Sequence, residues 1–218
     1  MRCFDEQGYP CELVTGPWGW GRNFVSGPDI DILDYGPGLD LVISRAGNVI
    51  LLFAGNGDLL EEFDATGAGL TAAIAAAISG DRIELPQGSI GGDYTVPAGV
   101  TLEGHGPETI LTGQITLGAG VHARMLKVAR DVDQAAPCIG ILTGDLTGAA
   151  AWIDKCIIEI ENATGDAIGV ATDGVQVWCQ DCFVTARGGG DGYGFDLTNR
   201  SGWIEGGTFW GSTAPLRY

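Results

Sequence analysis

Four carboxylates and one arginine in the C-terminal part of the chain have residue types and spacing that suit acid–base or cation chemistry. Asp166 and Asp191 occupy equivalent places in two similar segments, GDAIGV and GDGYGF, which lie 25 residues apart. Asp154 and Glu205 also recur in similar segments, and Arg187 lies in a glycine-rich stretch, ARGGGDG. Carboxylates brought together in this way bind a cation such as Ca²⁺ or act as an acid–base pair, with Asp166 and Asp191 as the candidate ligands. The alternative is that these acids are solvated turn residues.

The cysteines and histidines give a weaker signal for metal or redox chemistry. Cys179 and Cys182 form a CxxC motif, but the sequence has no second CxxC, and His105 and His122 lack zinc-finger spacing. We therefore interpret the cysteines as small, buried, apolar residues. The other four, which include a pair able to close a short N-terminal loop, are Cys3, Cys11, Cys138 and Cys156.

Three tryptophans recur at nearly equal intervals along the chain. Trp152, Trp178 and Trp203 are 26 and 25 residues apart, and a short polar break and a β-rich run follow each of them. If the neighbouring cysteines point inward, strand alternation turns these tryptophans outward. An exposed apolar stripe is covered by another subunit or by sugar rings that stack on it. We predict the subunit interface, with packing against a corner loop as a further alternative.

Internal repeats of 21 to 26 residues indicate the architecture. YTVPAGVTL at 94–102 matches ITLGAGVHA at 115–123, and the tryptophan segments repeat afterwards. Short β runs and glycine turns at such a period predict a solenoid, and each repeat fits one coil of a parallel β-helix. Bends are predicted at Asp154-Lys155, Gln180-Asp181 and Glu205-Gly206. The inward stack is predicted to place Cys156, Ile158 and Ile160 over Cys182, Val184 and Ala186, and these over Gly207, Phe209 and Gly211.

Two regions precede these repeats. Residues 1–69 contain turn signals and short apolar runs separated by RAGN and AGNGD, which predict a small antiparallel β-rich region for attachment or oligomerisation. Leu70, Ile74 and Ile78 then follow helical spacing in an alanine-rich segment, which opens a second region at 70–218. The predicted helix ends are Thr66 or Thr71 at the N-cap and Gly80 at the C-terminal cap.

The charge of the chain excludes some classes of partner. The sequence has 28 acidic and 11 basic residues, a formal net charge of −17. Such a charge repels nucleic acids and anionic membranes, so neither is a predicted partner. No apolar run is long enough for a membrane helix, and the first residues, MRCFDEQGYPCELVTG, lack the apolar core of a signal peptide. Synthesis in a cytoplasm is therefore expected.

The segment LTAAIAAAISGDRIELPQGSIGGDYTVPAGVTLEGHGPETIL resembles the entry to the right-handed parallel β-helix, or pectin-lyase-like, superfamily. The resemblance implies a mainly β fold, a short right-handed parallel β-helix with an N-terminal capping helix and a small antiparallel β-rich region before it. The GHG at His105 is similar to a motif of the pectin-hydrolysing members. Their accompanying aspartate pair and basic motif are absent, so a structural role is expected for His105.

The superfamily includes polysaccharide lyases and hydrolases, epimerases, and tailspikes and other virion proteins of bacteriophages. We predict a structural or adhesion component of a bacteriophage virion, of tail-spike, fibre or capsid-decoration type. It would be a homotrimer that contacts other virion proteins, is located in the virion and uses no cofactor, with Ca²⁺ as the alternative. A bacterial surface adhesin that binds a cell-surface glycan is one rival. The other is a polysaccharide lyase or glycoside hydrolase that uses Asp154, Asp166, Asp191, Arg187 and Glu205.

Overall fold

The computed structural model describes residues 40–144, 150–173, 176–198 and 202–217, and the backbone of residues 2–4, 10–16 and 19–23. The first described elements form a three-stranded antiparallel sheet of β1 (Arg2–Phe4), β2 (Pro10–Gly16) and β3 (Gly19–Asn23). Its register places Cys3 opposite Cys11 on neighbouring strands. The side chains of both cysteines, and so the predicted loop closure, lie outside the described residues.

A second antiparallel unit comes next along the described part of the chain and pairs with the repeats. It consists of β4 (Leu41–Ala46), β5 (Val49–Ala54) and β6 (Leu59–Asp64), connected at the two predicted hairpin turns. β4 also pairs in parallel with β7 (Arg82–Glu84), the first strand of the repeats. One sheet therefore runs from the antiparallel unit into the solenoid.

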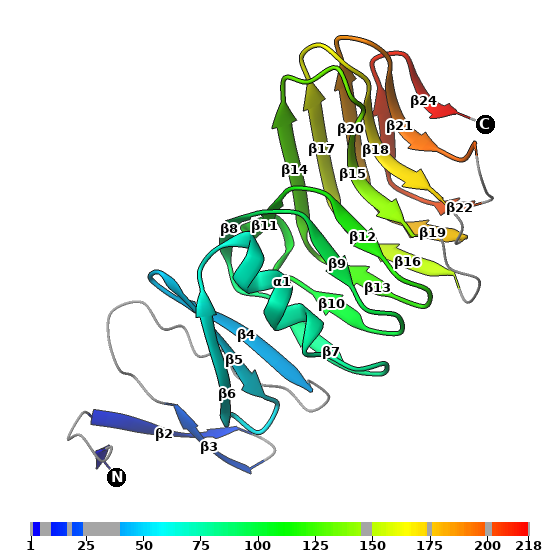
Figure 1. The fold of residues 1–218 in the computed structure, drawn as a ribbon. Helices are drawn as coiled ribbons and strands as arrows, with labels where there is room; N and C mark the ends of the chain where they lie inside the picture. The colour runs from blue at the N-terminus through cyan, green and yellow to red at the C-terminus, as the bar shows by residue number, and fades with distance from the viewer. Residues whose placement is uncertain are drawn as a thin grey trace.

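The helix α1 (Gly67–Ala75) covers the N-terminal end of the solenoid (Figure 1). Thr66 is the N-cap, since its hydroxyl accepts the Gly69 N–H at 3.2 Å. Leu70 and Ile74 are buried as predicted, but Ile78 is 71% exposed, so its assignment to the apolar face is wrong.

The helix also ends earlier than predicted. Its C-cap is Ala76, and the following N–H of Ile78 bonds the Asp81 carboxylate at 2.8 Å, which turns the chain away. The predicted cap Gly80 lies beyond the helix, at φ +101°.

The first residue of the helix, Gly67, packs closely against the first coil. A Cβ at this position would lie 2.0 Å from the Gly91 carbonyl oxygen, so only glycine fits where α1 meets that coil.

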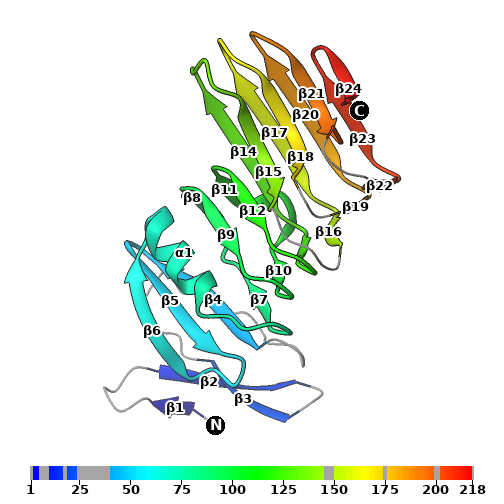
Figure 2. The same cartoon turned by 45° about the vertical axis from the view of Figure 1, so that its right-hand side comes forward.

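Eighteen strands then wind into a parallel β-solenoid, which confirms the predicted mainly β fold with repeated coils (Figure 2). Each coil contributes one strand to each of three sheets. The first three coils contain β7, β8 (Gly88–Gly91) and β9 (Tyr94–Val96); β10 (Thr101–Glu103), β11 (Thr109–Thr112) and β12 (Ile115–Leu117); and β13 (His122–Arg124), β14 (Lys127–Val132) and β15 (Cys138–Thr143). A short 3₁₀ turn, η1 (Gly106–Glu108), precedes β11.

The last three coils continue the same order. They contain β16 (Ala151–Asp154), β17 (Ile157–Asn162) and β18 (Ala167–Thr172); β19 (Val177–Gln180), β20 (Phe183–Gly188) and β21 (Gly192–Asp196); and β22 (Gly202–Glu205), β23 (Thr208–Gly211) and β24 (Ala214–Arg217). We call the sheet that contains β7 and β22 sheet I, the sheet from β8 to β23 sheet II, and the sheet from β9 to β24 sheet III.

The predicted stack of inward residues is confirmed by the strand register. Ile158 pairs with Val184 and then Phe209, while Ile160 pairs with Ala186 and then Gly211. The four cysteines with described side chains are buried free thiols, as their interpretation as small apolar residues requires. In-register coils about 4.8 Å apart thus line the interior with columns of apolar side chains.

The corners between sheets I and II confirm the predicted bends. Met125, Lys155, Asp181 and Gly206 occupy this corner in successive coils, all left-handed, with φ of 53°, 52°, 50° and 65°. The amide N–H of each of the three non-glycine residues donates to a carbonyl oxygen of the next coil, at 2.9 to 3.0 Å. The acceptor is in each case the residue just before the corner of that coil. The hydrogen-bonded ladder therefore continues through the bend and offsets the cost of a left-handed backbone.

A buried asparagine holds the opposite turn, between sheets II and III. The amide nitrogen of Asn162 donates to the carbonyl oxygens of Ala136 and Asp166, both at 3.0 Å. Its amide oxygen accepts the N–H groups of Gln134 at 3.1 Å and Gly165 at 3.2 Å. The side chain is 1% exposed, and of its partners the Gly165 N–H is buried with it, whereas the Asp166 carbonyl oxygen also accepts the Cys138 N–H at 2.8 Å.

Replacement of Asn162 by alanine is expected to lower the free energy of unfolding by about 2–4 kcal/mol, because it leaves buried backbone groups without partners. Urea denaturation followed by circular dichroism measures the change. Thr95→Ala, an exposed site on sheet III, is the matched control and should alter the midpoint little. Equal midpoints for the two variants would contradict the role of Asn162.

Candidate functional site

The three repeated tryptophans form a continuous column on the outer face of sheet I, which we call the Trp stripe. Trp152, Trp178 and Trp203 are directly paired across β16, β19 and β22. They are 41%, 36% and 57% exposed, as the predicted outward orientation requires. Their ring centroids are 4.8 and 5.7 Å apart, and the ring planes differ by 24° and 26°. The rings are therefore stacked on one another along the solenoid.

This stacking restricts what the Trp stripe can bind. A sugar packs against the face of an aromatic ring, but here each inner ring face is covered by the next tryptophan. On the side of the first coils, His122 lies 6.4 Å from Trp152 at a tilt of 55° and partly covers its other face. The stripe mainly presents ring edges, which form a narrow apolar surface. Its geometry favours a protein partner over a row of sugar rings.

The predicted carboxylate pair Asp166 and Asp191 lies together on adjacent coils, at the turn from sheet II to sheet III. The Asp191 N–H donates to the Asp166 carboxylate at 2.9 Å. The Asp191 carboxylate in turn accepts the hydroxyls of Thr213 at 3.0 Å and Tyr193 at 3.1 Å. Both acids thus bond backbone or hydroxyl groups at this turn in their own or the next coil, which favours the turn interpretation over a cation site. In the described residues, no group of three or more His, Cys, Asp or Glu is arranged to hold a metal ion.

The other residues of the predicted catalytic set lie elsewhere. Asp154 and Glu205 share an outer column of sheet I, but Gln180 stands between them in the register. Arg187 lies on sheet II, 3.3 Å from the Glu161 carboxylate. The structure therefore distributes the five residues over three places and does not assemble them around one reacting group.

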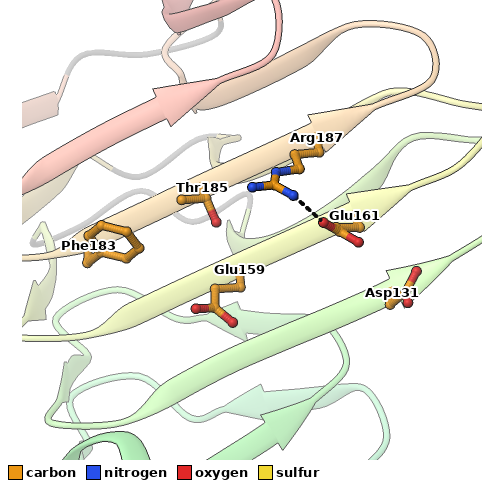
Figure 3. Close-up of a pocket in the computed structure, with 6 residues that line it drawn as sticks. All are labelled: Asp131, Glu159, Glu161, Phe183, Thr185 and Arg187. Atoms are coloured by element: carbon orange, nitrogen blue, oxygen red, sulfur yellow. Dashed lines mark hydrogen bonds and ion pairs between the residues drawn. The ribbon is translucent and has the colours of Figure 1, made fainter.

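A shallow groove on the outer face of sheet II is the main feature that the sequence analysis missed (Figure 3). It has a volume of about 490 Å³ and crosses β14, β17 and β20. Arg187 was the only one of its residues singled out from the sequence. The sequence could have revealed the groove through strand alternation, because residues two apart in one strand point to the same face of the sheet. Glu159 and Glu161 are spaced in this way, as are Phe183, Thr185 and Arg187. Its lining residues are Asp131, Glu159, Glu161, Phe183, Thr185 and Arg187.

The groove combines aromatic and charged groups. Phe183 is 45% exposed, and on the next strand Trp210 is 44% exposed, with the Arg187 guanidinium 5.6 Å from the Trp210 ring centre. Lys127 lies 2.6 Å from the Glu159 carboxylate, so two of the three groove carboxylates carry a basic partner. Aromatic faces beside hydrogen-bonding acids and a guanidinium suit a polyhydroxylated ligand such as a neutral glycan.

A second charged cluster was also not predicted and lies on sheet I, in the column of the Trp stripe and the column beside it. Glu103 forms ion pairs with Arg82 and Arg124 on the neighbouring strands. His105 approaches Glu84 at 2.9 Å, so it has a structural partner within the first two coils. Burial raises the pKa of Glu84, against the opposing effect of His105. The cluster pairs most of its charges internally.

Comparisons with known proteins do not add an assignment. No family model, curated protein or solved structure matches this chain. Within the described part of the chain, no helix has the length and apolar character needed to cross a lipid bilayer. The functional argument therefore depends on the surfaces of the solenoid.

The stack predicts unequal effects of removing its members. Trp178→Ala removes the ring that contacts two tryptophans, whereas Trp203→Ala removes a ring that contacts one. Each aromatic contact contributes about 0.5–1.5 kcal/mol beyond burial, so Trp178→Ala should lower the unfolding free energy more. Urea denaturation at one protein concentration measures both, and near-UV circular dichroism reports the loss of ring coupling. Trp210→Ala, outside the stack, is the control. An equal or larger loss of unfolding free energy for Trp203→Ala would contradict a stabilising stack of the three rings.

Proposed function

We propose that this chain is a structural and adhesion component of a bacteriophage particle that acts as a homotrimer. The observation that carries the proposal is the Trp stripe, three stacked and exposed rings on one face of a solenoid. The assignment to a phage particle rests on the resemblance to β-helix spike proteins. A spike, fibre or decoration of this kind would attach to other virion proteins.

The chemistry around the stripe supports its role as the subunit interface. Ring edges form an apolar surface whose burial is favourable by about 25 cal/mol per Å². The net charge of −17 opposes association of identical chains, so an interface needs a locally balanced region. Sheet I offers one, because Glu103 pairs with Arg124 in the column next to that of the stripe and with Arg82 in the column of the stripe itself. Three copies that turn this face inward would cover the tryptophans.

The oligomeric state tests this interface directly. We expect light scattering on a size-exclusion column, at physiological salt, to give three times the chain mass of 22.6 kDa. Changing all three stripe residues to glutamine should shift the protein towards a monomer, because the apolar surface is lost. Trp210→Gln on sheet II is the matched control and should leave the trimer intact. A monomeric natural chain, or a trimer that survives the triple change with folding retained, would refute the proposal.

The groove on sheet II favours a second function, an adhesin that holds a cell-surface glycan without cleaving it. Phe183 offers an exposed ring, and Glu161 and Arg187 are positioned by their mutual ion pair to bond hydroxyls (Figure 3). This function does not exclude the first, since a particle component can carry both an interface and a receptor site. The polysaccharide-cleaving alternative remains a prediction without a feature that favours it.

Glycan binding is testable with an array of bacterial capsular and O-antigen polysaccharides. We expect binding to at least one neutral polysaccharide, no depolymerisation, and a loss of affinity of at least about tenfold in Phe183→Ala and Arg187→Ala. Thr95→Ala on sheet III serves as the control. Binding that survives both groove changes would place the site elsewhere, and release of short sugars would support the enzyme alternative instead.

A further inference from the structure

Three buried thiols meet inside the solenoid, at the corner between sheets I and II. Cys156 and Cys182 occupy this corner in consecutive coils, and Cys179 lies on β19 beside it. The three side chains are 1%, 0% and 1% exposed and carry free thiols. The Cys182 thiol donates to the carbonyl oxygens of Gln180 at 3.2 Å and Ile153 at 3.5 Å, and the Cys156 thiol donates to that of Asp154 at 3.4 Å. Because Ile153 belongs to the coil of Cys156, the Cys182 sulfur reaches towards that coil.

The spacing of Cys156 and Cys182 suits a covalent bond between coils. The backbone ladder continues through the corner, since Phe183 N–H donates to the Cys156 carbonyl oxygen at 2.9 Å and Thr208 N–H to that of Cys182 at 2.8 Å. Stacked residues in such a ladder have Cα atoms about 4.8 Å apart, within the roughly 4.4–6.8 Å range of disulfides. Cys179 and Cys182 are instead separated along one chain by a left-handed corner, and no ladder holds their backbones together.

The three thiols affect one another's pKa values. The neighbouring thiols of Cys156 and then Cys179 lower the pKa of Cys182, while burial acts in the opposite direction. The pKa values of Cys156 and Cys179 are raised, first by the neighbouring Cys182 thiol and then by burial. A thiol with a lowered pKa supplies the thiolate that attacks an oxidant.

A small oxidant has a short route to this sulfur. The residue stacked on Cys182 in the last described coil is Gly207, where an added Cβ would lie 2.2 Å from the Cys182 carbonyl oxygen. Gly207 therefore places no side chain over Cys182, and Gly207 itself is exposed.

We propose that Cys156 and Cys182 are a site of oxidative modification, at which a peroxide forms a disulfide that joins two adjacent coils. The Cys182 thiolate attacks one peroxide oxygen, so an S–O bond forms, the O–O bond breaks and the departing hydroxide becomes water on taking a proton. The sulfur of Cys156 then attacks the sulfenic Cys182, an S–S bond forms and the S–O bond breaks. The second hydroxide takes the proton of Cys156. Two thiols lose two electrons in total, and one peroxide becomes two waters.

The disulfide would stabilise the solenoid without changing its outer surfaces. It closes a loop of one full coil, which restricts the unfolded chain and should raise the melting temperature by roughly 5–10 °C. The inference does not depend on the oligomeric state or on a glycan, so its outcome is separate from that of the proposed function.

Peptide mapping identifies the bond that forms. The purified chain is fully reduced, freed of reductant, treated with hydrogen peroxide, alkylated under denaturing conditions and cut before aspartates. The three thiols then fall on separate peptides, 154–165, 173–180 and 181–190. We expect peptides 154–165 and 181–190 to be joined, with Cys179 alkylated and the link reversed by dithiothreitol. Mapping is needed because Cys3, Cys11 and Cys138 also contribute to the total mass.

Two isosteric variants complete the test. Cys179→Ser should form the same link and show the same rise in melting temperature, whereas Cys156→Ser should form no link and show no rise. The proposal is overturned if peptides 173–180 and 181–190 are joined, or if all three natural thiols are alkylated after peroxide treatment. The mapping of the unchanged chain decides this even if a serine variant fails to fold.

Discussion

Most features of this protein depend on one constraint, the in-register parallel pairing of consecutive coils. Each strand bonds the equivalent strand of the next coil, so a residue lies about 4.8 Å from its counterpart one coil later. Residues at the same position of successive repeats therefore form a column along the solenoid. Tryptophan stacks on tryptophan, a left-handed corner follows a left-handed corner, and Cys156 lies next to Cys182.

The same constraint creates an electrostatic problem in a chain with a net charge of −17. Acids at equivalent positions become close neighbours, as in Glu84 with Glu103 and Asp131 with Glu161. Ion pairs with the few basic residues reduce this repulsion. Glu103 pairs with Arg82 and Arg124, Glu159 with Lys127, and Glu161 with Arg187. Where no base is present, hydroxyls take the role at Asp191 and a backbone N–H takes it at Asp166.

The outer faces are consequently not equivalent in what they can bind. On sheet I the tryptophans cover one another and leave ring edges, which suits contact with protein. On sheet II the aromatic rings of Phe183 and Trp210 are offset across strands beside acids and Arg187, and a groove of about 490 Å³ remains. Stacking inside the core adds a third chemistry, because it places buried free thiols at the same corner of consecutive coils. An interface, a binding groove and a covalent link can thus share one short solenoid.

The sequence by itself determined the coils, their bends and the direction of most side chains. Repeat length and strand alternation are local properties, so the stacks of Ile158 with Val184 and of Trp152 with Trp178 followed from spacing alone. The tertiary structure decided the end of α1 at Ala75 rather than near Ile78, because a contact with Asp81 diverts the chain there. It also decided which acids meet: Asp166 with Asp191 but not Asp154 with Glu205, between which a whole coil intervenes. The groove on sheet II and the thiol cluster at the corner were hidden for the same reason, since contacts between neighbouring strands depend on the residue at which each coil begins.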